Sequence, residues 1–125
     1  MEIPKLAEIG QIAITVSDVD EALAFYRDVL GLTFLFAAEP DLAFLDAAGV
    51  RLMLTKPEGA GAVGCNSTLY FRVRDLDTVH AAFVARGATD GGAPNLMARM
   101  PDHELWMGFL RDPDGNLVGL MEEKR

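Results

Sequence analysis

Residues 11–26 read Gln-Ile-Ala-Ile-Thr-Val-Ser-Asp-Val-Asp-Glu-Ala-Leu-Ala-Phe-Tyr, and residues 68–83 repeat this pattern as Thr-Leu-Tyr-Phe-Arg-Val-Arg-Asp-Leu-Asp-Thr-Val-His-Ala-Ala-Phe. In both stretches apolar residues alternate, as they do along a half-buried strand, and the spacing then becomes helical. Asp18 and Asp75 stand at the equivalent turns. A strand that leads into a helix, used twice, predicts a duplicated module.

Turn signals and alternating apolar runs extend each copy to a βαβββ unit. The predicted strands are 8–16, 33–37, 42–46, 50–55, 67–72, 95–100, 104–110 and 116–122. The predicted helices run between the cap Asp18 and Gly31, and over 76–86. We therefore expect an α+β protein of one domain, with module one at about 6–56, a Gly- and Pro-rich linker at about 57–66 and module two at about 67–123.

Size and charge limit the classes of function. The chain has 125 residues, a net charge of −8 and 11 scattered Lys and Arg residues, which argues against a nucleic-acid partner because phosphates would be repelled. No apolar run is long enough to cross a bilayer, and the first residues lack the layout of a secretory signal. The single Cys65 excludes an internal disulfide. We expect a cytoplasmic protein without a membrane partner.

Three stretches carry a resemblance to a known family: 12–32, 71–77 and the run Asp-Pro-Asp-Gly-Asn-Leu-Val-Gly-Leu at 112–120. With them the chain resembles the vicinal-oxygen-chelate superfamily, which includes glyoxalases, bleomycin-resistance proteins and extradiol dioxygenases. The resemblance implies that each βαβββ sheet curls into half of a U-shaped cup, that the chain forms a homodimer, and that a small molecule binds in the cup.

Metal-dependent members of that family place one ligand, a His, Gln or Glu, on the first and the last strand of each module. The matching positions here are Gln11, Met53, Thr68 and Gly119. Divalent ions need several carboxylate or imidazole groups, and this set offers neither. The sequence therefore predicts no metal and no other cofactor.

Strand alternation also identifies the side chains that line the cup. The predicted ligand-binding residues from this alternation are Gln11, Arg51, Met53, Thr68, Tyr70, Arg72, Gly119 and Met121, and Trp106 is added to them as part of a soft apolar set. Arg51 and Arg72 would grip a carboxylate or phosphate, or would pair with surface acids. Tyr70 would donate its hydroxyl or line the cavity with its ring, and Trp106 would join a soft, adaptable pocket or fill the core.

Histidines offer the remaining chemistry. His103 follows Asp102 and precedes Glu104. His103 and Glu104 are therefore the candidates for catalysis, or for a metal site outside the family positions. The alternative is that the segment is simply a turn. His80 is expected on a partly exposed face of the second helix.

Three functions remain open from the sequence. The first is a metal-free protein that binds or sequesters a small molecule in an anion-tolerant cup across a homodimer. The second is an enzyme, a glyoxalase-type lyase, isomerase or dioxygenase-like activity with a non-standard site that would use His103, Glu104 or Gln11. The third is a partner-binding module that no longer holds a ligand.

Overall fold

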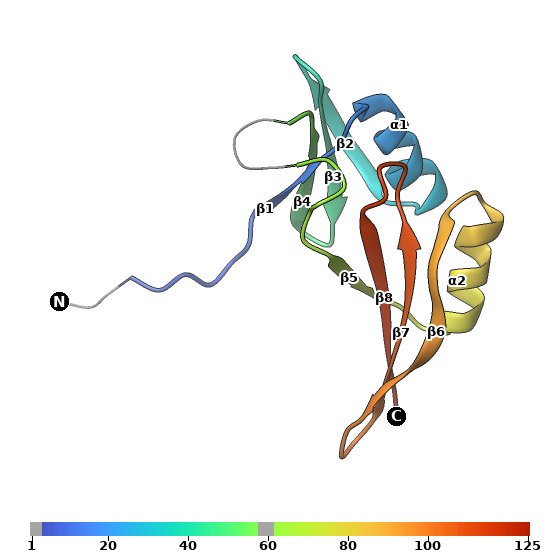
Figure 1. The fold of residues 1–125 in the computed structure, drawn as a ribbon. Coiled ribbons are helices and arrows are strands. Elements are labelled where there is room, and N and C mark those ends of the chain that lie inside the picture. The colour runs from blue at the N-terminus through green and yellow to red at the C-terminus, as the bar shows by residue number, and fades with distance from the viewer. Residues whose placement is uncertain (1–3, 58–61) are drawn as a thin grey trace.

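Each copy of the repeat forms a four-stranded mixed sheet with a helix against one side (Figure 1). The computed structural model describes residues 4–57 and 62–125, so residues 58–61 of the expected linker lie outside it. The elements are β1 (Gln11–Thr15), α1 (Val19–Leu23), η1 (Ala24–Val29), β2 (Thr33–Ala38), β3 (Leu42–Ala47), β4 (Val50–Thr55), β5 (Leu69–Arg72), α2 (Leu76–Ala85), β6 (Thr89–Arg99), β7 (Glu104–Arg111) and β8 (Leu117–Lys124).

The strand order is β1-β4-β3-β2 in the first sheet and β5-β8-β7-β6 in the second. In both, the first strand of the module pairs in parallel with the last, and the other neighbours are antiparallel. This confirms the predicted α+β fold. No helix in the described ranges is long and apolar enough to cross a bilayer.

The first helix begins at the predicted cap and ends before Gly31 as predicted, but its second half is wider than an α-helix. The Asp18 carboxylate accepts a hydrogen bond from the backbone N–H of Glu21 at 3.0 Å, which caps the first turn. From Ala24 the helix widens into the π-helical turn η1, and Gly31 follows with a φ of 82°, a conformation that glycine adopts without strain. The widened turn carries Tyr26, which is buried.

The second helix uses a cap that the repeat does not predict. Asp75 has a φ of 57° and makes no side-chain cap, although it matches Asp18 in the repeat. Instead, the two carboxylate oxygens of Glu122 on β8 accept the backbone N–H groups of Asp75 and Leu76, each at 3.0 Å. A distant strand thus supplies the acceptor that the local sequence supplies in module one.

The turn at 112–116 joins the two modules. Asp112 is buried and accepts a hydrogen bond from the Tyr26 hydroxyl at 2.8 Å, while Asp114 accepts the backbone N–H of Ser17 at 2.9 Å. Burial, and then the charge of Asp112, raise the pKa of Tyr26 far above its usual value. The sequence predicted a turn here; the structure shows that the turn also fastens module two to η1.

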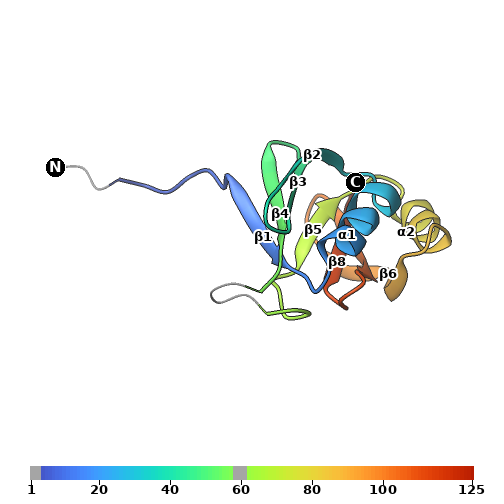
Figure 2. The same cartoon turned by 90° about the horizontal axis from the view of Figure 1, so that it is seen from above.

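One continuous core lies on the helix sides of both sheets. It includes Ile14 and Leu54 from the first module and Leu110, Val118 and Leu120 from the second. Viewed from above, α1 lies toward the second sheet as well as against its own (Figure 2). Because the helix sides face this shared core, the opposite sides of the two sheets are left for other uses.

Two predicted strand starts lie furthest from those in the structure. β1 begins at Gln11 rather than at 8, and residues 4–10 lead away from the body of the molecule (Figures 1 and 2) with Leu6 fully exposed. β6 begins at Thr89 rather than at 95, because Gly91 and Gly92, which suggest a loop, instead lie within an irregular part of the strand. At Gly91 a Cβ would lie 3.1 Å from the backbone of Leu110, which explains the small residue.

Candidate functional site

We call the side of each sheet that faces away from its helix the open face. On the first open face, β1 and β4 place Gln11 beside Arg51. The Arg51 Nε donates a hydrogen bond to Gln11 Oε1 at 3.1 Å, and Gln11 Nε2 lies 3.6 Å from the sulfur of Met53. The amide of Gln11 is therefore engaged on both sides by its neighbours.

Two aromatic residues complete this face. Phe44 on β3 pairs with Met53, and its ring stacks on Phe36 of β2 with centroids 4.5 Å apart. The Arg51 guanidinium lies 5.6 Å from the centre of the Phe44 ring, within the range of a cation–π contact. Phe36 and Phe44 were not among the predicted cup residues, although Phe44 lies opposite Met53 in the β3–β4 hairpin and shares its face.

On the second open face the ring of Tyr70 fills the space that a side chain at residue 119 would occupy. Tyr70 on β5 pairs with Gly119 on β8. A Cβ atom at Gly119 would lie 2.8 Å from Tyr70 Cε1 and 3.0 Å from its Cγ, which is closer than real atoms approach. The ring also meets Phe109 edge-on at 5.9 Å and stays 49% exposed, so it forms a half-open aromatic platform.

Arg72, two residues after Tyr70, extends the same face toward the end of β5. It pairs with Met121 across the strands, and its guanidinium is 3.7 Å from Glu123, a loose contact for a side chain that is 72% exposed. Thr68 precedes β5 and is half-buried.

Trp106 does not join the other predicted residues. It pairs with Glu122, whereas its neighbour Met107 pairs with Met121, so alternation puts Trp106 on the helix side. Its indole N–H donates to Glu104 at 3.1 Å, and Lys124 Nζ lies 4.3 Å from the ring centre. Trp106 packs against the core, the second of the two roles that the sequence left open.

The two catalytic candidates point to different partners. His103, in the turn between β6 and β7, has Nδ1 2.8 Å from Asp102, and Arg125 donates to the same carboxylate at 2.7 Å. These two contacts hold the pKa of Asp102 below its usual value. Glu104 instead accepts from the indole of Trp106. Both candidates belong to the second module, and Gln11 belongs to the first.

His80 is buried, and the prediction of a partly exposed histidine was wrong. Its Nε2 lies 3.1 Å from the carbonyl oxygen of Phe109 and 3.2 Å from Asp90 Oδ1. Gly108 faces the ring, and a Cβ there would lie 3.4 Å from His80 Cδ2, in ordinary van der Waals contact. The residue joins α2 to β7 and β6, a structural role.

Two βαβββ modules that share a core and keep one open face each define a paired-module α+β protein. The chain belongs to the Glyoxalase/Bleomycin resistance protein/Dioxygenase superfamily, whose family model matches residues 8–120. A search of curated proteins found no significant match.

Solved structures resemble nearly the whole chain. An integron cassette protein from the mobile metagenome of V. cholerae is 21% identical over 97% of this chain and 98% of that one, with a TM-score of 0.79. Lactoylglutathione lyase from Agrobacterium tumefaciens is 27% identical over 95% and 96%, with a TM-score of 0.73. TnmS3, an antibiotic binding protein from Streptomyces sp. CB03234, is 23% identical over 98% and 100%, with a TM-score of 0.75.

The family positions for a metal do not fit one here. They provide the Gln11 amide, whose oxygen already accepts from Arg51, the Met53 thioether, the Thr68 hydroxyl, and no side chain at Gly119. Zinc, nickel and the hard divalent ions prefer imidazole or several oxygen ligands. Within residues 4–57 and 62–125, no group of three His, Cys, Asp or Glu side chains is close enough to hold an ion.

Proposed function

We propose that this protein binds a small molecule without a metal, holding an anionic or amphipathic ligand in a cup formed across a homodimer. The observation that carries the proposal lies at the last of the four family positions for a metal ligand. Glycine stands there as Gly119, which has no side chain to bind a metal, and the Tyr70 ring packs over it. An aromatic platform at this place supports stacking of a ligand rather than coordination of an ion.

The charge of the first open face supports an anionic group on the ligand. Arg51 donates from Nε to the neutral amide of Gln11 and lies over the Phe44 ring. Among residues 4–57 and 62–125 its Nη groups have no partner, so they can form two parallel hydrogen bonds to a carboxylate. The stacked Phe36 and Phe44 rings beside it would hold an apolar part of the same molecule. The ligand expected from these groups is an aromatic or alkyl acid.

Two sheet edges support the homodimer. In the part of the chain that the structure describes, β1 and β5 each pair with a strand on one side only, although the Asn66 side chain bonds the backbone N–H and C=O of Thr15 at the end of β1. Free edges with half-exposed apolar side chains favour pairing with another chain. In the proposed dimer, β1 of one copy lies beside β5 of the other, which brings the first open face of one copy opposite the second open face of its partner.

The likeness to TnmS3, an antibiotic binding protein, is consistent with binding as the function of this architecture. That likeness, at 23% identity, concerns the fold, and the ligand class proposed here rests on Arg51, Tyr70 and the two stacked phenylalanines.

A thermal-shift screen of aromatic and alkyl carboxylates tests the proposal. A ligand present at 100 times its Kd stabilises the folded state by about 2.7 kcal/mol, so the Tm rises measurably. Arg51→Gln should abolish this rise for acids, while the matched Arg99→Gln, on the far hairpin, should retain it. A lower Tm in EDTA, or about one metal ion per chain by elemental analysis, would contradict the metal-free proposal.

A second function has one observation in its favour. Asp102 orients the imidazole of His103 at 2.8 Å, as carboxylates do beside general bases. We infer from this pair an alternative lyase, isomerase or dioxygenase-like activity that would also use Gln11 or Glu104. If a panel of glyoxalase-type substrates shows turnover, His103→Ala should abolish it; unchanged turnover would remove His103 from the mechanism.

A further inference from the structure

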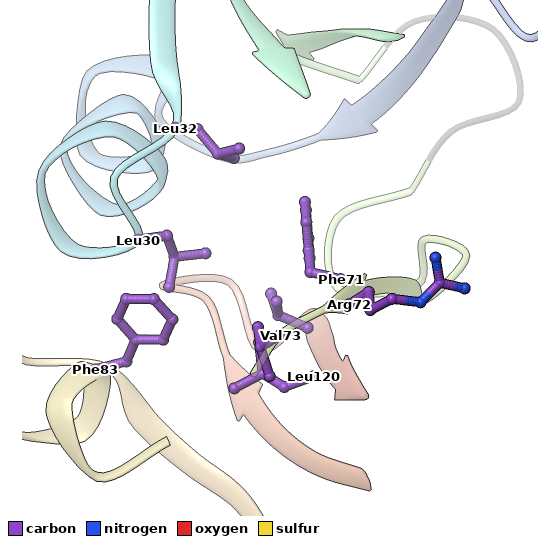
Figure 3. A pocket seen from close by; sticks show the side chains of 8 residues that line it. Leu30, Leu32, Phe71, Arg72, Val73, Phe83 and Leu120 are labelled. Atoms are coloured by element: carbon purple, nitrogen blue, oxygen red, sulfur yellow. The ribbon is translucent and has the colours of Figure 1, made fainter. Parts of the chain in front are cut away.

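An apolar hollow lies between the two modules on the helix side, away from both open faces. Its volume is about 210 Å³, and its walls come from the segment after η1, from β5, from α2 and from β8. The apolar side chains around it include Leu30, Leu32, Phe71, Val73, Phe83 and Leu120 (Figure 3). An engineered apolar cavity of roughly 150 Å³ takes benzene, so this hollow has room for a ring or a short alkyl chain.

A polar hollow of about 540 Å³ adjoins it. The two hollows share Arg72 and Val73, so they meet at the end of β5. Figure 3 shows the Arg72 side chain directed away from Phe83 and Leu30, out of the apolar hollow. The polar hollow is also lined by Arg74, Glu122, Glu123 and Arg125.

The carboxylates in the polar hollow are already engaged. Both oxygens of Glu122 cap α2, and Glu123 accepts from Arg125 at 3.0 Å. Glu123 reaches Arg72 only at 3.7 Å. In the part of the chain that the structure describes, no carboxylate lies within 4.0 Å of the Arg74 guanidinium. The hollow therefore keeps guanidinium groups available for an outside anion.

We propose that these joined hollows form a second ligand site, for a short amphipathic carboxylate. Its phenyl or alkyl group of six to eight carbons lies between Leu30 and Phe83, and its carboxylate is held by Arg72 and Arg74 at the end of β5. The apolar walls exclude a charged tail, because they offer it no hydrogen bonds. The apolar hollow lies on the opposite side of the sheets from the cup, and Arg72 at the end of β5 is the one proposed residue that also belongs to the second open face. The ligand proposed for the cup rests on Arg51 and Tyr70, so the two proposals can fail separately.

Methyl and amide NMR with octanoate as the probe tests this site. We expect the methyl signals of Leu30, Val118 and Leu120 to shift together in a saturable titration. 1-Octanol has the same tail without the charge and should bind at least tenfold more weakly, which is the loss expected for one charge-assisted contact.

Variants separate the two parts of the site. Arg74→Gln should weaken octanoate about tenfold and leave 1-octanol unchanged. Arg99→Gln, an exposed arginine on the β6–β7 hairpin, serves as the matched control and should alter neither. Leu30→Phe should weaken both probes by filling the hollow, and Phe83→Trp provides the same test if Leu30→Phe does not fold.

Three results would overturn the proposal. Equal affinity for octanoate and 1-octanol would remove the carboxylate from the recognition. Shifts confined to Gln11, Met53 and Tyr70 would place octanoate in the cup, which would support the first proposal against this one. Shifts at Leu30 and Val118 that follow protein concentration rather than octanoate would show that a second copy of the chain fills the hollow.

Discussion

Replacing Gly119 by alanine tests the relation between this glycine and Tyr70 directly. The added methyl group would lie 2.8 Å from Tyr70 Cε1 and 3.0 Å from its Cγ, so the ring must move. The ring can swing toward solvent, because it is 49% exposed, but it then loses its edge-on contact with Phe109. We expect a cost of about 1–2 kcal/mol, in the lower part of the range for an overfilled site.

Urea unfolding, followed by the fluorescence of Trp106 and by circular dichroism, measures this cost. Gly10→Ala is the matched control, since nothing lies within 4 Å of a Cβ at that position, and it should change stability by less than about 0.5 kcal/mol. In the Tyr70→Ala background, Gly119→Ala should lose most of its effect, giving a coupling of about 1 kcal/mol in the double-mutant cycle.

Equal effects of Gly119→Ala and Gly10→Ala would contradict a clash with the Tyr70 ring. The clash would also be refuted by a cost at Gly119 that persists when Tyr70 is alanine, because the strain would then lie in the backbone of β8 and not in the ring. In either case the aromatic platform of the second open face would need a different explanation.

Other variants and conditions test the junction and the helix cap. Tyr26→Phe leaves the buried Asp112 without one of its donors and should cost about 1–3 kcal/mol in urea unfolding, with a larger effect than an exposed change such as Glu8→Gln. Because the pKa of Tyr26 is raised in the folded state, its contribution to stability is complete below pH 10, its ordinary pKa, and is lost as the pH rises further. The Tm of the wild type should therefore fall more steeply above pH 10 than that of Tyr26→Phe, and equal slopes would contradict this. Glu122→Ala should cost about 0.5–2 kcal/mol by uncapping α2, and hydrogen exchange should be faster in its first turn while α1 stays unchanged.

The sequence predicted the fold because its decisive signals are local. The alternation in 11–16 and 68–73, and the cap Asp18, act within a few residues, so each can be read from one segment. The same alternation assigned Gln11, Arg51, Tyr70 and Gly119 to one face of their strands, whereas the register that pairs Gln11 with Arg51 and Tyr70 with Gly119 comes from the structure.

The features that escaped prediction depend on contacts between distant segments. His80 is buried where its ring contacts Phe109 and Asp90 of the second sheet, and α2 is capped by Glu122, a residue of another element. Trp106 was assigned to the cup because its side chain is large and adaptable. Its place next to Met107 in β7, which puts the two side chains on opposite faces, was not considered. A local pattern shows which face of a strand a residue lies on, and it found the cap of the first helix. It says little about which side chain of a distant element caps a helix or fills a space.

The hydroxyl of Tyr26 distinguishes the two halves of the duplication. In the repeat, Phe83 stands where Tyr26 stands in the first copy, so a junction mirrored on the other half would have no proton to offer a buried carboxylate. The two copies therefore differ at this position. Tyr26 forms a hydrogen bond to Asp112 of the other module, whereas Phe83 lines the apolar hollow. A protein built from two copies of the second module would therefore lack this hydrogen bond between modules, which requires the tyrosine of the first module.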